Sequence, residues 1–420
     1  MPPHAPHGLP RSEDSAPSEP RTGDSSRADL SSAERRTGAT SQSTARSRLA
    51  AAERSARRGL SHLGLDSRAD LLLVLAVALW LGYTAIASLA HGGPSADALP
   101  FLIAPVVILA GVAAGRVLAS RSTHVDPSRS PDDDTTDAPA PRRGVTTTHL
   151  SAAVALVAGL ALLVPFYANA QAAFGLQLVA LAGLLALSNE RHEPDTLAPT
   201  RVTHLTLPVP TLVAVVLGVL LAGRAQAAGV LVVVLALVLT LALVRRDLPS
   251  RRRLTAPRTL VIAGGAVIAV AAAVVTWLGG LSTWPTWLST SGSLSGARHA
   301  LWVDALELWS QRPLTGSGPG SFAASSPIAA TRADLSEVHS SVLQVAAELG
   351  LVGVLLLAGL LAAGLAVGAQ RGGRAALVAT TAWTALAVHS MIDHLYEFPP
   401  VTLAAGLVLG WASAPHHRPA

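Results

Sequence analysis

Arg298 and His339 stand near the two ends of a long break in the hydrophobic pattern, between Leu281 and Ser341. Arginine binds anions through a planar fork of donors, and histidine exchanges protons near neutral pH. Between these two residues, positions 316–321 read Gly-Ser-Gly-Pro-Gly-Ser. The segments on both sides have the composition of membrane spans, so we expect any chemistry to occur in this loop.

Gly316, Gly318 and Gly320 are candidates for contact with a substrate, because a residue without a side chain lets a ligand approach the backbone. The run lacks the Lys-Ser or Lys-Thr ending with which a P-loop binds nucleotide phosphates. A second interpretation is that these glycines only shape the loop.

A helix is expected to carry Arg298 toward the glycine run. Apolar residues recur at helical spacing within 298–311, and the acidic residues lie off that face: Leu301, Trp302, Ala305, Leu306 and Trp309, against Asp304 and Glu307. The pattern predicts an amphipathic helix on the outer membrane surface with its tryptophans at headgroup level. Arg312 and Pro313 end it.

The composition places the chain among polytopic membrane proteins. Half of its 420 residues are hydrophobic, 14% are charged, and the mean hydropathy is +0.45. All 31 basic residues are arginine, and their position at membrane faces explains the high pI without a nucleic-acid partner. The absence of cysteine excludes a disulfide framework, a thiolate metal site and a cysteine nucleophile.

The hydropathy predicts an all-α protein with about ten transmembrane helices. They are 70–90, 99–119, 149–167, 171–188, 205–222, 226–244, 259–280, 342–368, 375–392 and 398–413. Residues 1–68 are expected to be a disordered tail, 69–416 the transmembrane domain, 120–148 a linker, and 281–341 a large loop between the seventh and eighth spans. No cleavable signal begins the chain, so the first span is expected to direct insertion.

The distribution of arginine predicts that both termini are cytoplasmic. With this orientation the tail, the linker and most arginines outside the spans lie inside, as the positive-inside rule requires. The exceptions, which would lie outside, are Arg224, Arg298, Arg312 and Arg332. The loop 281–341 is therefore expected on the outer face.

His339 opens the span that follows the loop. At helical spacing His339 shares a face with Gly350, where a small residue would let another helix pack closely. Glu348 lies on the opposite face, roughly 13 Å deeper, so it is not expected to pair with His339. Glu348 and His389 are the only ionisable residues near mid-span, which disfavours an ion-coupled transporter.

These residues resemble the signature of the O-antigen ligase and O-antigen polymerase family. The similarity rests on Arg298, Trp302, Pro313, Gly316, Gly318 and Phe322, then His339, Leu343, Glu348, Gly350 and Gly353, and it extends to His389–Asp393 and to the turn Gly223–Gly229. Ser340 stands where the family usually has asparagine, and Gly223 where it has serine. The resemblance covers residues 205–413.

The resemblance implies glycosyl transfer on the outer face of the cytoplasmic membrane. The donor would be a polyprenyl-diphosphate-linked saccharide and the acceptor a hydroxyl of a glycan or glycolipid, with no nucleotide sugar, cofactor or metal. Arg224 and Arg298 would stabilise the diphosphate leaving group, and His339 would act as general base. Ser340 and Asp393, with the three glycines, would bind substrate. A single displacement would invert the anomeric centre.

Each assignment has a structural alternative. Arg298 could anchor a surface helix by snorkelling, Arg224 could occupy a turn, and His339 could neighbour a helix cap. Asp393 and Glu397 could simply solvate a loop, and Glu348 is expected to be a structural hydrogen-bonding residue. At the level of function, the alternative is a non-enzymatic transporter of lipid-linked saccharide or an inactive relative. The sequence does not separate ligase from polymerase.

Overall fold

A computed structural model describes residues 67–93, 95–122, 146–163, 167–189, 209–225, 255–284, 286, 296–332 and 335–415, and every structural statement below refers to them. Contacts divide the chain into Met1–Leu60, which lies outside this described part, and Ser61–Ala420, which carries every described element. Most of the predicted tail and linker, and the predicted span 226–244, lie outside the described residues.

The described regular structure is entirely helical. The helices are α2 (Arg68–Ala90), α3 (Leu99–Arg121), α4 (Thr147–Leu163), α5 (Ala168–Asn189), α6 (Val209–Ala222), α9 (Pro257–Gly279), α11 (Gly296–Gln311), α12 (Phe322–Ser325), α13 (Ser341–Ala369), α14 (Gly373–Met391) and α15 (Pro399–Ser413), with short 3-10 turns η1 (Ala96–Ala98), η3 (Ala329–Thr331) and η5 (Leu395–Glu397). Except for 226–244, each predicted span coincides with one of these helices.

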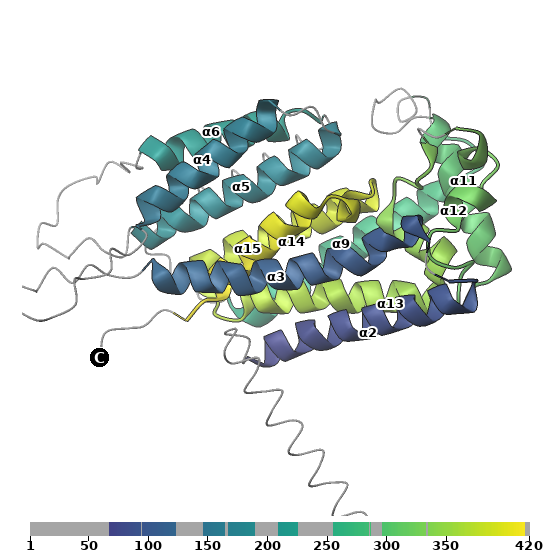
Figure 1. Cartoon of the computed structure of the whole chain (residues 1–420), viewed down its shortest axis with the longest axis horizontal. Helices are drawn as coiled ribbons and strands as arrows, with labels where there is room; N and C mark the ends of the chain where they lie inside the picture. Colours follow the sequence, from purple (N-terminus) through teal and green to yellow (C-terminus); the bar gives the residue numbers. More distant parts are fainter. Residues whose placement is uncertain are drawn as a thin grey trace, which may run out of the picture. The chain divides into compact units, whose positions relative to one another are not determined.

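Five of the described helices are long and apolar enough to cross a membrane: Arg68–Ala90, Ala96–Arg121, Ala168–Ser188, Pro257–Gly279 and Ser341–Ala369. The prediction of an all-α polytopic membrane protein is therefore confirmed, while the number of spans stays a prediction. Helices α4, α5 and α6 pack together, α3 packs along α15, and α13 lies against α2, α9 and α14. Helices α11 and α12 lie at one end of the long helices (Figure 1).

Close packing between α3 and α15 depends on glycine. A Cβ added at Gly115 of α3 would lie 2.9 Å from the backbone nitrogen of Trp411, and one at Gly111 would lie 2.9 Å from the Cα of Gly406. Small residues allow helix backbones to approach in this way inside a membrane, where packing replaces the hydrophobic effect as the force between helices. Helix α15 is thereby held against α3, which fixes the position of η5 just before it.

A buried ion pair lies near the start of α2 and the C-terminal ends of α3 and α15. Arg116 of α3 donates to Asp70 of α2 at 2.7 Å and to the Ser413 hydroxyl at 2.9 Å. Asp70 also completes a capping box with Ser67 at the start of α2. Both charged side chains are almost fully buried, and the carboxylate and the guanidinium satisfy each other. This pair joins α2, α3 and α15.

Helix α13 is interrupted at Gly350, where φ is 66° and ψ is −163°. The segment before the glycine run crosses this break, because Leu351 N donates to Pro313 O at 2.8 Å and Gly318 N donates to Glu348 O at 2.9 Å. The sequence predicted that Gly350 lets a neighbouring helix pack closely. Instead, the glycine breaks its own helix, and the loop binds the backbone groups that the break exposes.

Gly350→Ala is expected to destabilise the protein by at least about 2 kcal/mol. Its positive φ is costly for any side chain, and the added Cβ would overlap the backbone of Leu314. Gly359→Ala is the matched control, because Gly359 lies in the same helix with no atom within 4 Å of an added Cβ. Thermal unfolding of the purified variants measures the difference. Equal midpoints for the two variants would contradict the role given to Gly350.

Candidate functional site

Helix α11 positions Arg298 by burying one face against the protein. Leu301, Trp302 and Ala305 are at most 1% exposed, and Trp302 Nε1 donates to Val338 O at 3.1 Å. The predicted apolar face is correct, but the placement of Trp302 at the headgroups is wrong, because this indole fills the protein interior. Arg298, one turn before Trp302, therefore points into the protein as well.

His339 has a strained backbone. Its φ is 54°, and among the described residues it is the one non-glycine with positive φ. Such strain costs about 1–3 kcal/mol and is common at functional sites. The sequence placed His339 on the helix face, but α13 begins two residues later, with Ser340 as N-cap accepting from Leu343 N at 3.4 Å. This places the imidazole just before the N-terminus of α13, beside residues that follow α14.

Asp393 lies at the centre of the site. Its Oδ1 is 3.3 Å from His339 Nδ1, and its carboxylate accepts from the Tyr167 hydroxyl at 3.1 and 3.2 Å. Asn169 donates to the same carboxylate, and the backbone amide of His394 donates to Oδ1 at 2.9 Å. Asp393 is fully buried, so the alternative that it solvates a loop is wrong.

The Arg298 guanidinium closes the other side of the cluster. Its Nη1 donates to Ile392 O at 2.7 Å, its Nη2 donates to the Tyr167 hydroxyl at 3.0 Å, and Nη2 lies 3.6 Å from Asp393 Oδ2. Arg298 is only 8% exposed. The snorkelling alternative therefore does not fit, because the guanidinium points toward Asp393 and not toward headgroups. Arg298 and His339 share one carboxylate across the loop.

The electrostatics of the cluster favour an ionised Asp393 and a neutral His339. Burial alone would raise the pKa of Asp393, but contacts with His339 and His394 and the charge of Arg298 hold it well below its usual range. Burial lowers the pKa of His339 from its ordinary value, against the opposing effect of Asp393. Burial and the neighbouring Asp393 charge raise the pKa of Tyr167 to about 12, so its hydroxyl stays protonated.

Glu348 anchors the glycine run and does not contact His339 in the described structure. Its carboxylate accepts from Gly320 N at 2.6 Å and from Phe322 N at 3.2 Å. This agrees with the prediction of a structural role for Glu348. The pair of amides fixes the turn between α11 and α12.

The predicted glycines pack against protein atoms. Gly316, Gly318 and Gly320 all have positive φ. An added Cβ would overlap the Glu348 backbone at Gly316, approach the His91 ring within 2.7 Å at Gly318, and lie 2.8 Å from Asp97 Cβ at Gly320. These contacts favour the interpretation that the glycines shape the loop. Substrate contact by them stays a prediction.

Arg224 does not join the Asp393 cluster. It is exposed, and its Nη2 lies 3.4 Å from Leu162 O, near the end of α4. Leu162 precedes Tyr167 by five residues along the chain. Arg224 therefore lies at the end of α4 that leads to the cluster, without a described contact to Arg298 or His339.

Sequence reasoning missed Tyr167, Asn169 and His394. Tyr167 is the last residue of the third predicted span, and Asn169 lies in the short turn before the fourth, which the predicted topology puts on the same side as Arg298. The available signal was these two polar residues close together between two apolar segments. His394 directly follows Asp393, and its ring stacks on Tyr167 with centroids 5.4 Å apart.

Glu397 also differs from expectation. Its side chain is 19% exposed and its Oε2 lies 3.8 Å from His394 Nε2. Burial and the neighbouring Glu337 raise the pKa of Glu397 above its ordinary value. The alternative that Glu397 only solvates a loop is therefore wrong, because the carboxyl group is packed beside the cluster.

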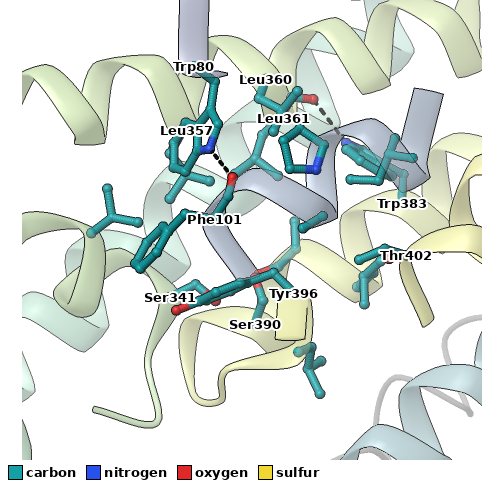
Figure 2. A pocket seen from close by; sticks show the side chains of 17 residues that line it. Trp80, Phe101, Ser341, Leu357, Leu360, Leu361, Trp383, Ser390, Tyr396 and Thr402 are labelled. Atoms are coloured by element: carbon teal, nitrogen blue, oxygen red, sulfur yellow. Dashed lines mark hydrogen bonds between the residues drawn. The ribbon is translucent and has the colours of Figure 1, made fainter. Parts of the chain in front are cut away.

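An apolar cavity of about 80 Å³ lies next to the cluster. Figure 2 shows Trp80 and Phe101 along one side, joined by a hydrogen bond of 2.6 Å, with Ser341 and Tyr396 at another edge. Ser341 Oγ donates to Asp393 O at 3.1 Å, so the cavity wall also supports the cluster. The cavity is smaller than the roughly 150 Å³ that holds benzene, so a saccharide cannot enter it.

Comparison with protein families matches residues 211–358 to the O-antigen ligase family. The match includes Arg224, Arg298 and His339, whereas Tyr167 and Asp393 lie outside it. A comparison with curated proteins gave no match. The family suggests ligase-like or glycosyltransferase-like activity in general terms.

Proposed function

We propose that this chain, which belongs to the O-antigen ligase family through residues 211–358, is a membrane glycosyltransferase. It would transfer or polymerise saccharide from a polyprenyl-diphosphate donor to a hydroxyl of a glycan or glycolipid. The reaction would occur on the outer face of the cytoplasmic membrane. The observation that carries the proposal is the meeting of the Arg298 guanidinium and the His339 imidazole at the Asp393 carboxylate.

The proposed step is a single displacement at the anomeric carbon. The acceptor oxygen forms a bond to that carbon while the bond to the diphosphate oxygen breaks, so the configuration inverts. His339 takes the acceptor proton, and the diphosphate leaves with the electron pair. Because Nδ1 of His339 faces Asp393, a neutral ring with its proton on Nδ1 presents the lone pair of Nε2 to the acceptor.

Arg298 would stabilise the negative charge that develops on the diphosphate. A guanidinium held by protein contacts needs little reorganisation during the reaction, which makes its electrostatic effect large. Ile392 O and the Tyr167 hydroxyl hold it in place. Arg224 would bind the donor outside the cluster, near the end of α4. These residues require neither metal nor nucleotide for the proposed step.

An apolar groove supports a lipid-linked donor. Its volume is about 670 Å³, and it is lined by α3, α4, α5 and α15, from Phe174 and Pro399 at one end to Leu185 and Trp411 at the other. At about 1.5 Å per residue, Phe174 to Leu185 spans roughly 16 Å of helix. Phe398, adjacent to the groove, stacks on Tyr167 at 5.8 Å. A polyprenyl chain in this groove would bring its diphosphate toward the cluster.

Ala153→Trp is expected to raise the KM for the lipid-linked donor about tenfold or more with a smaller change in kcat. Ala153 is an exposed residue of α4 that lines the groove, so the indole would occupy the space of the lipid. Ala152→Trp is the control, because Ala152, the residue before Ala153, is also exposed but does not line the groove. Steady-state rates at varied donor concentration give both constants. Equal KM values for the two variants would remove the groove from the donor site.

Reconstitution tests the proposed function directly. The purified full-length chain in proteoliposomes is given a polyprenyl-diphosphate-linked saccharide and a glycan or glycolipid acceptor. The expected result is a glycosylated acceptor together with released polyprenyl diphosphate. Movement of intact donor across the bilayer without cleavage would instead support the transporter alternative and overturn the enzyme proposal.

A further inference from the structure

Three potential metal ligands converge at the centre of the cluster. Asp393 Oδ1 lies 3.3 Å from His339 Nδ1 and 3.0 Å from His394 Nδ1. In the described part of the chain, these residues form the one group of histidine and acidic side chains whose ligand atoms all lie within 4.8 Å of one another. His339 comes from the segment just before α13, and Asp393 and His394 come from the segment just after α14. Two separate backbone segments therefore hold the three residues.

The two distances from the Asp393 carboxylate to the histidine nitrogens suit a tetrahedral metal ion. Zn²⁺ binds imidazole nitrogen and carboxylate oxygen at about 2.0–2.2 Å, so two ligands of one tetrahedral ion stand about 3.3 Å apart. The distances around Asp393 Oδ1 are close to this value. His394 Nδ1 is buried and lies 3.0 Å from Asp393 Oδ1. This nitrogen is therefore in position to contribute a ligand.

We propose that His339, Asp393 and His394 form a Zn²⁺ site whose occupancy inhibits the enzyme. Binding of the ion does not depend on the proposed function, whereas the inhibition rests on it. A neutral imidazole has one proton, so Zn²⁺ at Nδ1 of His339 leaves that proton on Nε2. The Nε2 lone pair, which would accept the acceptor proton, is then absent.

Arg298 sets the strength of this site. The guanidinium lies 3.6 Å from Asp393 Oδ2 and repels a second cation. Zn²⁺ binding is therefore weaker than in a structural zinc site and is reversible by a chelator. Mg²⁺ and Ca²⁺ prefer six or more oxygen ligands, so a set of two nitrogens and one carboxylate does not hold them.

The test measures Zn²⁺ binding and inhibition separately. ZnCl₂ is titrated into the purified full-length chain in detergent, in competition with a chromophoric chelator, and the transfer rate is measured with ZnCl₂ or MgCl₂. We expect Zn²⁺ to inhibit reversibly and Mg²⁺ to have no effect. His394→Asn should weaken Zn²⁺ binding at least about tenfold, whereas His91→Asn, at an exposed histidine, should leave it unchanged.

Arg298→Gln gives a second, opposite change. Removal of the positive charge should tighten Zn²⁺ binding severalfold, which a misfolded variant or adventitious binding to other histidines would not produce. Equal Zn²⁺ affinity in the wild-type and His394→Asn proteins would overturn the site. Binding that depends on His394 without any effect on a measurable transfer rate would overturn the inhibition. If the protein shows no transfer activity at all, the proposed function fails, while the binding titration still decides the site.

Discussion

Replacement of His339 by alanine is expected to lower kcat for glycan transfer by about 10²- to 10⁴-fold. The imidazole is held 3.3 Å from Asp393, and a backbone of positive φ directs it into the cluster. Alanine removes the proposed general base, but it leaves Arg298 and the proposed donor groove in place. The KM for the donor should therefore change little.

His91→Ala is the control for this variant. His91 is an exposed histidine whose ring lies 3.3 Å from Arg312, outside the Asp393 cluster. It should retain nearly the full rate. Single-turnover kinetics with radiolabelled donor separate chemistry from binding, and size-exclusion profiles establish that both proteins are folded. Full product from His339→Ala would remove the general base from the mechanism.

The pH dependence of the transfer rate tests the same role of His339 as general base. Burial places the pKa of His339 below its ordinary value of about 6.5. A base must be unprotonated, so the rate should stay level from neutral pH downward and fall only as pH passes below 6.5. His339→Ala should lose this acid limb. An acid limb above pH 7 in the wild-type enzyme would contradict a neutral, buried base.

Hydropathy predicted the helices well because a membrane span must be long and continuously apolar. Every predicted span in the described part of the chain corresponds to a helix within a few residues. The break between Leu281 and Ser341 also led to Arg298 and His339, since charged groups are unexpected in such a chain. These predictions need only local sequence, which is why they could be made without the structure.

Local sequence could not predict which residues assemble around Asp393. Tyr167 is 226 residues from Asp393 along the chain, and only the packing of α5 beside α14 and α15 brings the two together. Periodicity predicts a helical position for His339, because it cannot reveal a positive φ just before an N-cap. It likewise predicts a packing role for Gly350, because it cannot reveal the positive φ that interrupts α13 there. Backbone geometry that departs from a regular period leaves no periodic signal.

Arg298→Ala is expected to lower kcat by about 10²- to 10³-fold, equivalent to roughly 2.7–4 kcal/mol of transition-state stabilisation. Arg298→Lys should recover little of this loss. A lysine ammonium is a compact charge without the planar fork that bonds Ile392 O and the Tyr167 hydroxyl together. Arg312→Ala is the matched control, because Arg312 is an exposed arginine of the same loop. Rates near wild type for Arg298→Ala would exclude Arg298 from the chemistry.

The pH dependence of the residual activity in the two Arg298 variants separates the effect of the positive charge from the effect of the guanidinium geometry. The guanidinium charge helps to lower the pKa of His339, so its removal in Arg298→Ala should raise that pKa. The acid limb of the rate profile would then move to higher pH. Arg298→Lys keeps a positive charge, so its acid limb should stay near the wild-type position even though its rate is low. The same limb in all three proteins would mean that Arg298 and His339 do not act on one reacting centre, because groups that share Asp393 must affect each other's protonation.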